Sequence, residues 1–567
     1  MNIAKNIAFL PSNFSITDWN SIEPYFNKLD QMPLTSEKEL NDFLLNKSEL
    51  ETAIDEDQAW RYIRVNVDTR DEEAKKAFEF FIDEIEPKVE NWFNRIDRKL
   101  AASPAMRFFE AEHVIPARTL KKNIEIFREE NLVIFAELQK EEQEYGSIIS
   151  EMTVNIDGKD YTLQQAAELL QENDRSFREK VYKSIFARRV EKSEAFNDLL
   201  SRMLRKRYKI AINAGYKNFR DYQHHNLGRF DYTVEEIQNF HQAIAEEVNP
   251  LVDDILNHRK SKLGVEKLKP WDLQVDIEGK APLRPFPNTK ILKEKAEECF
   301  NAVSNDFGAI FGTLNRENLL DLDSRIGKAP GGFNYPLHKS NRSFIFMNAT
   351  GSMGDFETLM HEGGHAFHAN YYNHYSLIDY KNVPAEVAEL ASMSMELISM
   401  EHWEKILKDS TELKRAKRLL LEGAIIVLPW IAAVDKFQHW LYKNPEHTHH
   451  ERNLAWTNIY REFSSPIVDW EGVEDAFVFT WQRQLHIFEM PFYYIEYAFA
   501  QLGAIAIWKH YKENPLLTLS HYKNFMEKGY SLTIPEIYNE AGIEFSFSKE
   551  YINQLMGFIK KELDGLY

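Results

Sequence analysis

The sequence has almost no cysteine and no long uncharged stretch. Cys299 is the only cysteine among 567 residues, which excludes an intrachain disulfide and a cluster of thiolate metal ligands. The longest uncharged apolar run, residues 423–434, is far shorter than the roughly 20 residues that span a bilayer. We interpret it as a buried helix kinked at Pro429. The apolar run within residues 1–15 is too short for a signal-peptide core, so we expect a cytoplasmic protein.

Basic charge is scarce relative to acidic charge. The chain has 69 lysines and arginines against 89 aspartates and glutamates, and a formal net charge of −20. Nucleic acid and anionic membranes attract basic surfaces, so this balance argues against both as partners. Hydrophobic residues make up 44% of the chain, which is enough to bury a sizeable core.

Strand signals are also scarce, and helical periodicity dominates. Charged, amphipathic stretches with few glycines or prolines predict helices over residues 37–63, 70–100, 120–147, 163–214 and 234–263. Alternation around Asp157-Gly158 predicts a β-hairpin at residues 152–163. Residues 343–347 (SFIFM) predict a short strand, either an edge to which an extended peptide could add or an ordinary buried strand. The predicted fold class is mainly α.

Residues 361–365 read His361-Glu362-Gly363-Gly364-His365, an HExxH pattern. On a helix, the two histidines lie one turn apart on the same face, where both imidazoles can bind one zinc ion. Glu362 is offset around the helix, so it can reach a zinc-bound water and act as a base rather than as a ligand. The pattern favours a zinc hydrolase, provided that the segment is helical and a third ligand exists.

Local signals predict that this segment is a helix. Ser352 and Asp355 have the spacing of a capping box, and apolar residues follow at helical intervals. Gly363 and Gly364 each cost a helix about 1 kcal/mol relative to alanine. That cost is understandable if another backbone or a substrate passes close by, and close helix packing explains it equally well.

The third ligand must come from elsewhere in the chain. Pro384 begins a second predicted helix that offers Glu386, Glu389 and Glu396. Glu386 and Glu389 share a face, and spacing alone does not choose between them. His368 lies on the ligand side of the first helix. It is a candidate for a hydrogen-bond partner of a ligand, for a substrate contact, or for a side chain without a chemical role.

An aromatic segment near the C-terminus contains His486, Tyr493, Tyr494 and Tyr497. Tyrosine and histidine can donate hydrogen bonds to the oxyanion of a tetrahedral intermediate. A packed aromatic helix is the competing interpretation, which we favour for Tyr493. Two other groups of histidines are expected to lie in solvated regions without metal: His447, His449 and His450, and His224 with His225.

Several motifs occur together in a fixed order. They are INAGYKNFRDY (212–222), RFDYT (229–233), APGGFN (329–334), SFIFMNATG (343–351), HEGGHAFH (361–368), VPAEVAELASM (383–393) and HIFEMPFYYIEY (486–497). In this combination the chain resembles the oligoendopeptidase F branch of the thimet oligopeptidase family of zinc metallopeptidases. The resemblance covers roughly residues 120–567 and is strongest around HEGGHAFH.

The resemblance implies roles for individual residues. It makes His361, His365 and Glu389 the ligands of one zinc ion per chain and Glu362 the general base. His486 and Tyr497 match the family's transition-state donors, and Tyr494 is the best match to a further donor. The implied fold is a two-lobed helical body with a deep substrate channel and only a few short strands near the zinc. We expect an N-terminal helical lobe over residues 1–200 and a catalytic region over residues 201–567, with an approximate boundary.

The predicted function is a zinc metalloendopeptidase that hydrolyses internal bonds of short, unfolded oligopeptides. One alternative is a zinc carboxypeptidase or dipeptidyl carboxypeptidase on a related helical fold, although no motif here marks a cation for a substrate's C-terminal carboxylate. The other alternative is a catalytically silent peptide-binding protein, against which the intact ligand set and Glu362 argue.

Overall fold

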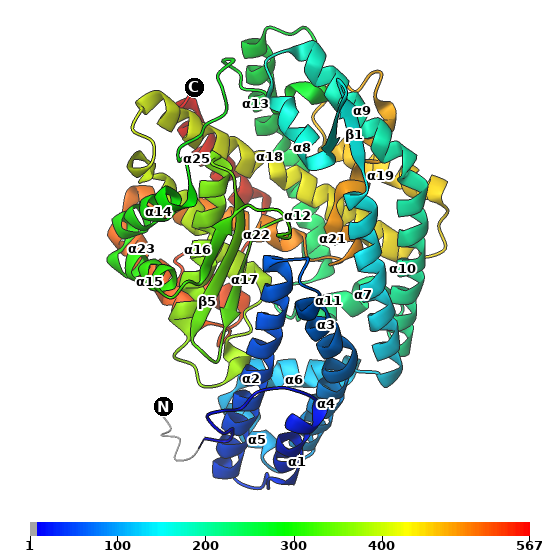
Figure 1. Ribbon diagram of the computed structural model, residues 1–567, viewed down its shortest axis with the longest axis vertical. Helices are drawn as coiled ribbons and strands as arrows, with labels where there is room; N and C mark the ends of the chain where they lie inside the picture. Colours follow the sequence, from blue (N-terminus) through cyan, green and yellow to red (C-terminus); the bar gives the residue numbers. More distant parts are fainter. Residues whose placement is uncertain (1–7) are drawn as a thin grey trace. The chain divides into compact units, whose positions relative to one another are not determined.

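The computed structural model describes residues 8–567, which are mainly helical with five short strands (Figure 1). Contacts divide the chain into two units, each built from three separate segments. Unit 1 contains the described part of Met1–Phe127, Arg284–Leu413 and Gly503–Phe545, and unit 2 contains Arg128–Leu283, Lys414–Leu502 and Ser546–Tyr567. The predicted boundary near residue 200 is a different division and stays a prediction. Residues 1–7, part of the N-terminal segment analysed for a signal peptide, lie outside the described residues.

Unit 1 combines N-terminal helices with a small sheet and the helices around it. The N-terminal helices are α1 (Glu23–Gln31), α2 (Glu37–Val67), α3 (Glu72–Phe80), α4 (Glu86–Ala101), α5 (Met106–Glu112) and α6 (Val114–Ile126). The sheet strands are β3 (Leu320–Asp323), β4 (Phe333–Leu337) and β5 (Arg342–Ala349). The other helices are α14 (Thr289–Val303), α15 (Asn305–Arg316), α16 (Met353–Tyr372), α17 (Ala385–Met400), α23 (Pro515–Lys528) and α24 (Ile534–Glu540).

Unit 2 is helical apart from one hairpin. Its helices are α7 (Glu129–Ser150), α8 (Leu163–Glu168), α9 (Arg175–Glu191), α10 (Ser193–Asn213), α11 (Phe219–Asn226), α12 (Val234–Glu247), α13 (Asn249–Leu263), α19 (His449–Phe463), α20 (Glu474–Val478), α21 (Leu485–Phe488) and α25 (Lys549–Asp564). Two further helices, α18 (Ser410–Lys443) and α22 (Ile495–Glu513), contribute residues to both units. These elements confirm the predicted mainly α fold with few short strands.

The structure divides the longer predicted helices at local stop signals. The predicted helix at residues 37–63 is α2, whose N-cap Ser36 forms a capping box with Glu39. The predicted helix at residues 234–263 is two helices, because Pro250 stands in the first turn of α13 and has no backbone N–H to continue α12. Asp174 caps α9 and so separates it from α8.

The predicted hairpin is present. Strand β1 (Thr153–Ile156) pairs antiparallel with β2 (Lys159–Thr162), with Thr153 opposite Thr162. The turn residues Asp157 and Gly158 both have positive φ, 54° and 84°, as a tight two-residue hairpin turn requires. The hairpin packs on α8 and α9 rather than standing alone.

The second sheet corrects one sequence interpretation. Strand β5 is central, with β3 parallel on one side and β4 antiparallel on the other. The interpretation of residues 343–347 as a free edge is therefore wrong, and the buried-strand interpretation is right. The outer strands of this sheet are β3 and β4, and β4 and β5 both pack on α16. The sheet lies against the helix that carries the HExxH pattern.

The packing of α16 against two neighbouring helices, α14 and α17, explains the two glycines. A Cβ added at Gly364 would lie 2.6 Å from the Cα of Ser392 and 2.9 Å from the carbonyl oxygen of Ala391, both in α17. A Cβ at Gly363 would collide with the ring of Phe300 in α14. Close helix packing is thus the reason for the glycine pair, because each position meets a neighbouring helix of unit 1.

Helix α18 contains the apolar run and continues through Pro429. Among residues 8–567, no helix is both long enough and apolar enough to cross a membrane.

Substituting Gly364 with alanine should lower stability. The change improves intrinsic helix propensity by about 1 kcal/mol, but forcing a methyl group into the packed backbone of α17 costs about 1–3 kcal/mol. We expect a lower thermal unfolding midpoint for Gly364→Ala. Gly557→Ala in α25 is the matched control, because a Cβ there meets nothing within 4 Å, and it should raise the midpoint slightly. A higher midpoint for both variants would contradict the packing argument.

Candidate metal centre and active site

In unit 1, two histidines of α16 and one glutamate of α17 lie close together where the two helices pack. Helix α16 begins at a capping box of Ser352 and Asp355, as predicted, and carries His361 and His365 with ring centroids 4.8 Å apart. Glu389 comes from α17, and its Oε2 lies 3.4 Å from His361 Nε2 and 3.5 Å from His365 Nε2. Two ligands bound at about 2.0–2.1 Å to a tetrahedral zinc lie about 3.3–3.5 Å apart. The donor set and its spacing fit a zinc ion.

The structure distinguishes the glutamates of α17 by position. Both Glu386 and Glu389 are buried, but only Glu389 faces the two histidines and belongs to this group. Glu396, two turns beyond Glu389, accepts a hydrogen bond from His361 Nδ1 at 2.6 Å. Such a carboxylate fixes the ring and leaves Nε2 directed toward a metal. The sequence analysis named Glu396 only as a candidate ligand. Its spacing of seven residues from Glu389 places both side chains on one face of the helix, which is the signal that could have revealed its role.

The electrostatics of the group favour an added cation. Burial opposes the charge of Glu389, but the imidazoles of His365 and His361 outweigh it and hold its carboxyl pKa below the usual range. Burial likewise opposes the charge of His361, but hydrogen bonds and attraction from Glu389 and Glu396 hold its pKa well above the usual value. Burial, with the charge of Glu396 adding to it, raises the pKa of Glu357 to about 8. These three carboxyls thus outnumber the imidazoles of His361 and His365.

Glu362 is buried beside the sheet. Its exposed fraction is 6%. Burial raises the pKa of its carboxyl, while His361, His365 and a hydrogen bond from the backbone of Asn334 oppose the rise. Asn334 belongs to β4, an outer strand of the sheet. The carboxylate that the sequence nominated as a base therefore lies between the histidine pair and a strand edge.

His368 has a different environment from its neighbours on α16. Its ring packs against Tyr372 and Phe525, and only 2% of it is exposed. Burial lowers its pKa to about 3. Its Nε2 has no hydrogen-bond partner among the described residues. This environment favours a packing role over contact with a substrate.

The predicted oxyanion donors form a half-buried cluster in unit 2. The ring of His486 lies 4.6 Å from Tyr494, 5.9 Å from Tyr497 and 6.1 Å from Tyr493, measured between centroids. All three tyrosines therefore surround His486, and burial does not set Tyr493 apart. Because the histidine–glutamate group belongs to unit 1, the combination of the two clusters in one active site stays a prediction.

Two side chains fix the tautomer of His486. The indole of Trp430 is a donor only, and its Nε1 donates to Oε1 of Gln484 at 2.8 Å. The amide nitrogen of Gln484 therefore faces His486, and it donates to Nδ1 at 2.6 Å. A neutral imidazole whose Nδ1 accepts carries its proton on Nε2. His486 thus presents an N–H donor, and the sequence analysis missed the two residues that orient it.

The remaining histidines named from the sequence do not form a metal-binding group in the described chain. His447 Nε2 accepts a hydrogen bond from Arg452 Nε at 2.9 Å, and His449 Nε2 lies 3.1 Å from the hydroxyl of Ser201. His224 Nε2 lies 3.0 Å from the carbonyl oxygen of Tyr232. The expectation that these histidines bind no metal stays a prediction.

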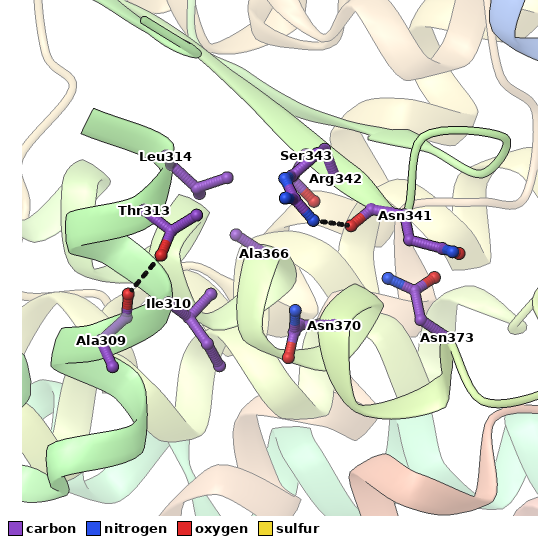
Figure 2. A pocket seen from close by; sticks show the side chains of 10 residues that line it. All are labelled: Ala309, Ile310, Thr313, Leu314, Asn341, Arg342, Ser343, Ala366, Asn370 and Asn373. Atoms are coloured by element: carbon purple, nitrogen blue, oxygen red, sulfur yellow. Dashed lines mark hydrogen bonds between the residues drawn. The ribbon is translucent and has the colours of Figure 1, made fainter. Parts of the chain in front are cut away.

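A cavity of about 270 Å³ lies on another side of α16, in unit 1 (Figure 2). Its lining is neutral apart from Arg342 and includes Asn341, Asn370, Asn373 and Ile310. None of the proposed ligands or bases lines it. This cavity is separate from the candidate metal centre.

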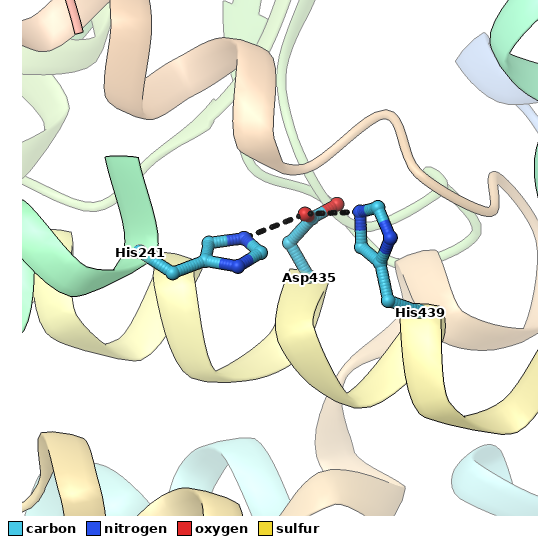
Figure 3. Close-up of side chains that lie close together, drawn as sticks. All are labelled: His241, Asp435 and His439. Atoms are coloured by element: carbon cyan, nitrogen blue, oxygen red, sulfur yellow. Dashed lines mark hydrogen bonds and ion pairs between the residues drawn. The ribbon is translucent and has the colours of Figure 1, made fainter. Parts of the chain in front are cut away.

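A second group with metal-ligand character was missed by the sequence analysis. His241, Asp435 and His439 lie together in unit 2 (Figure 3). Only the four-residue spacing of Asp435 and His439 was visible in the sequence, because His241 is 194 residues away from Asp435.

Comparisons with known proteins agree over most of the chain. Residues 168–557 match Peptidase family M3, and residues 9–123 match the Peptidase M3 N-terminal domain. The chain is 22% identical over 494 residues to the oligoendopeptidase F homolog of Borreliella burgdorferi, covering 85% of this chain and 80% of that protein. It is 22% identical over 322 residues to oligopeptidase PepF of Bacillus subtilis, covering 56% and 47%. A solved structure of Pz peptidase A with an inhibitor superposes with a TM-score of 0.90 at 27% identity, covering 98% of this chain and 99% of the other.

Proposed function

This chain belongs to peptidase family M3 and is a metallopeptidase, and we propose that it is a zinc-dependent endopeptidase acting on short, unfolded oligopeptides. The observation that carries the proposal is the convergence of His361, His365 and Glu389 next to the buried carboxyl of Glu362. Three protein ligands that leave a fourth position open are typical of catalytic rather than structural zinc. The oligopeptidase names of the Borreliella and Bacillus relatives support the substrate class.

In this proposal His361, His365 and Glu389 hold the zinc. When bound, zinc supplies Lewis-acid chemistry, polarising a carbonyl and lowering the pKa of water. Glu396 holds the proton of His361 on Nδ1, so Nε2 would be free to bind the metal. The ion also compensates the acidic groups that surround the two imidazoles.

Glu362 acts as the general base and then as the general acid. It accepts a proton from the attacking water and passes it to the leaving amine. Its burial supports the role of base, because a carboxylate that is less stable as an anion takes up a proton more readily. Glu362 follows His361 directly on α16, so it can face the reacting water without becoming a ligand.

The outer strand β4 supports an endopeptidase over a carboxypeptidase. An extended peptide added to a strand edge is bound through its main chain, whatever the position of its ends. Asn334 of β4 hydrogen-bonds to Glu362 through its backbone, so a peptide along this strand brings internal amide bonds near the base. A carboxypeptidase needs in addition a cation for the terminal carboxylate.

His486, Tyr494 and Tyr497 donate hydrogen bonds to the oxyanion in the proposed mechanism. The contacts from Trp430 through Gln484 support a donor at His486 Nε2. Burial raises the pKa of the Tyr494 phenol, with Arg483 and Trp430 opposing the rise, so this hydroxyl keeps its proton at neutral pH. Donors held in place before the reaction stabilise developing charge without reorganising.

Glu362→Gln should keep the zinc and lose most turnover, because the amide cannot take a proton from water. General acid–base catalysis contributes about 10²- to 10⁴-fold, and we expect a fall in kcat of that order. The assay uses a quenched fluorescent peptide with an acetylated N-terminus and an amidated C-terminus, together with zinc analysis.

Glu386→Gln on α17 is the matched control for a buried glutamate outside the ligand group, and we expect it to retain activity. Cleavage of the blocked peptide by the wild-type protein distinguishes an endopeptidase from a carboxypeptidase. Near-normal turnover by Glu362→Gln would remove this residue from the mechanism, and no turnover by the wild-type protein would favour a peptide-binding protein.

Tyr494→Phe and Tyr497→Phe should lower kcat more than they change KM, because an oxyanion donor acts mainly in the transition state. Loss of one such donor costs about 10²- to 10³-fold in kcat. Tyr493→Phe is the control, since its ring is the most distant of the three from His486. Steady-state kinetics on the same peptide measure all three. If only Tyr493→Phe were impaired, the assignment of the tyrosines would be reversed.

A further inference from the structure

Two histidines and one aspartate are buried together in unit 2, and none of them has a role in the proposed function. His241 comes from α12, and Asp435 and His439 lie one turn apart on α18 (Figure 3). Oδ2 of Asp435 lies 2.8 Å from His241 Nε2 and 3.2 Å from His439 Nε2. None of the three side chains is more than 7% exposed.

The protein alone does not satisfy the polar atoms of this group. His241 hydrogen-bonds to Asp435, and His439 Nε2 contacts the same carboxylate without meeting hydrogen-bond geometry. Nδ1 of His439 and Oδ1 of Asp435 have no hydrogen-bond partner among the described residues. Buried polar groups are rarely left in this state, because they have given up their hydrogen bonds to water. Several such atoms gathered in one buried cluster indicate a ligand that they bind together.

We propose that His241, Asp435 and His439 form a second metal site, which binds a divalent transition-metal ion. Two imidazole nitrogens and one carboxylate oxygen are a donor set that zinc and similar ions prefer. The three donor atoms lie within 4.8 Å of one another, as in the group of His361, His365 and Glu389. In both groups two ligands sit four residues apart on one helix and the third comes from another helix.

The charges of the group suit a dication. Asp435 is 0% exposed and its carboxylate lies against the imidazoles of His241 and His439. A carboxylate at 0% exposure has given up its hydration, so a cation beside it would be strongly favourable.

A cavity gives an ion access to the group. His241 and His439 line a cavity of about 470 Å³, together with Glu246, Glu462 and Lys436. Lys436 forms an ion pair with Glu462, which reduces its repulsion of an entering cation. Such a space also accommodates water as a fourth ligand, since three protein ligands do not complete a tetrahedron.

The site is coupled to the turn that precedes the catalytic tyrosines. Gln438, next to His439, accepts a hydrogen bond from the backbone N–H of Phe492 at 2.8 Å, and the Phe492 ring packs edge-on against His439. Phe492 has φ of 68°, which a residue other than glycine seldom adopts and which its surroundings must hold. An ion that ties α12 to α18 would stabilise this turn, so the inferred role is structural.

The test is the zinc content of a protein that lacks the first site. His361→Ala/His365→Ala protein is loaded with zinc chloride, desalted and analysed by mass spectrometry for metal. We expect one zinc per chain in this variant and two in the wild-type protein. Addition of His439→Gln should lower the content of the double variant to zero, whereas addition of His450→Ala, an exposed histidine of α19, should leave it at one.

Stability provides a second readout. Zinc should raise the thermal unfolding midpoint of the double variant, and a chelator should reverse the rise, because an ion that binds only the folded state stabilises it. Absence of zinc from the double variant would overturn the proposal and leave a purely hydrogen-bonded cluster, and so would one zinc per chain retained after His439→Gln. The double variant keeps the second group intact, so its zinc content decides even if the His439→Gln protein does not fold.

Discussion

The close contact between α16 and α17 is the interaction on which the proposed chemistry depends. Gly364 lets the two backbones approach at Ser392 and Ala391, and this approach sets the register in which α17 faces α16. In that register Glu389 lies opposite Nε2 of both histidines, and Glu396 lies opposite Nδ1 of His361. Neither carboxylate would be placed correctly if the helices were separated by an extra methyl group, because core packing leaves little free space.

The two proposed metal groups follow the same physical principle. Each places a carboxylate next to two imidazoles inside the protein, where an unpaired charge is costly. Around the first group, the carboxyls of Glu357, Glu362, Glu389 and Glu396 outnumber the two imidazoles. In the second group, Asp435 faces His439, whose ring makes no hydrogen bond among the described residues. A divalent cation would resolve both imbalances, in the first by compensating the acidic charge and in the second by binding a nitrogen of His439. Catalytic and structural roles would then be divided between the units, one ion in each.

Local patterns in the sequence predicted much of this structure. The capping box at Ser352, the helix that follows it and the hairpin at Asp157-Gly158 depend on neighbouring residues, and all three are present. Features that depend on contacts between residues far apart in the sequence were harder to predict. Spacing could not rank Glu386 against Glu389, because both share a helix face and only the packing of α17 on α16 distinguishes them.

The same limit explains what the sequence analysis got wrong or missed. It allowed a free edge at residues 343–347, because nothing local reveals that β3 and β4 flank that strand. It missed His241 with Asp435 and His439, since α12 and α18 meet only in the folded chain. It named His486 but not Gln484 and Trp430, whose hydrogen bonds fix the imidazole and carry no recognisable motif.

The central claim is that His361, His365 and Glu389 bind zinc, and anomalous X-ray diffraction at the zinc absorption edge tests it most directly. Crystals of the zinc-loaded protein should give a strong anomalous peak about 2.0–2.2 Å from Nε2 of both histidines and from the carboxylate of Glu389. No peak at this position, or a peak whose third protein ligand is Glu386, would contradict the account.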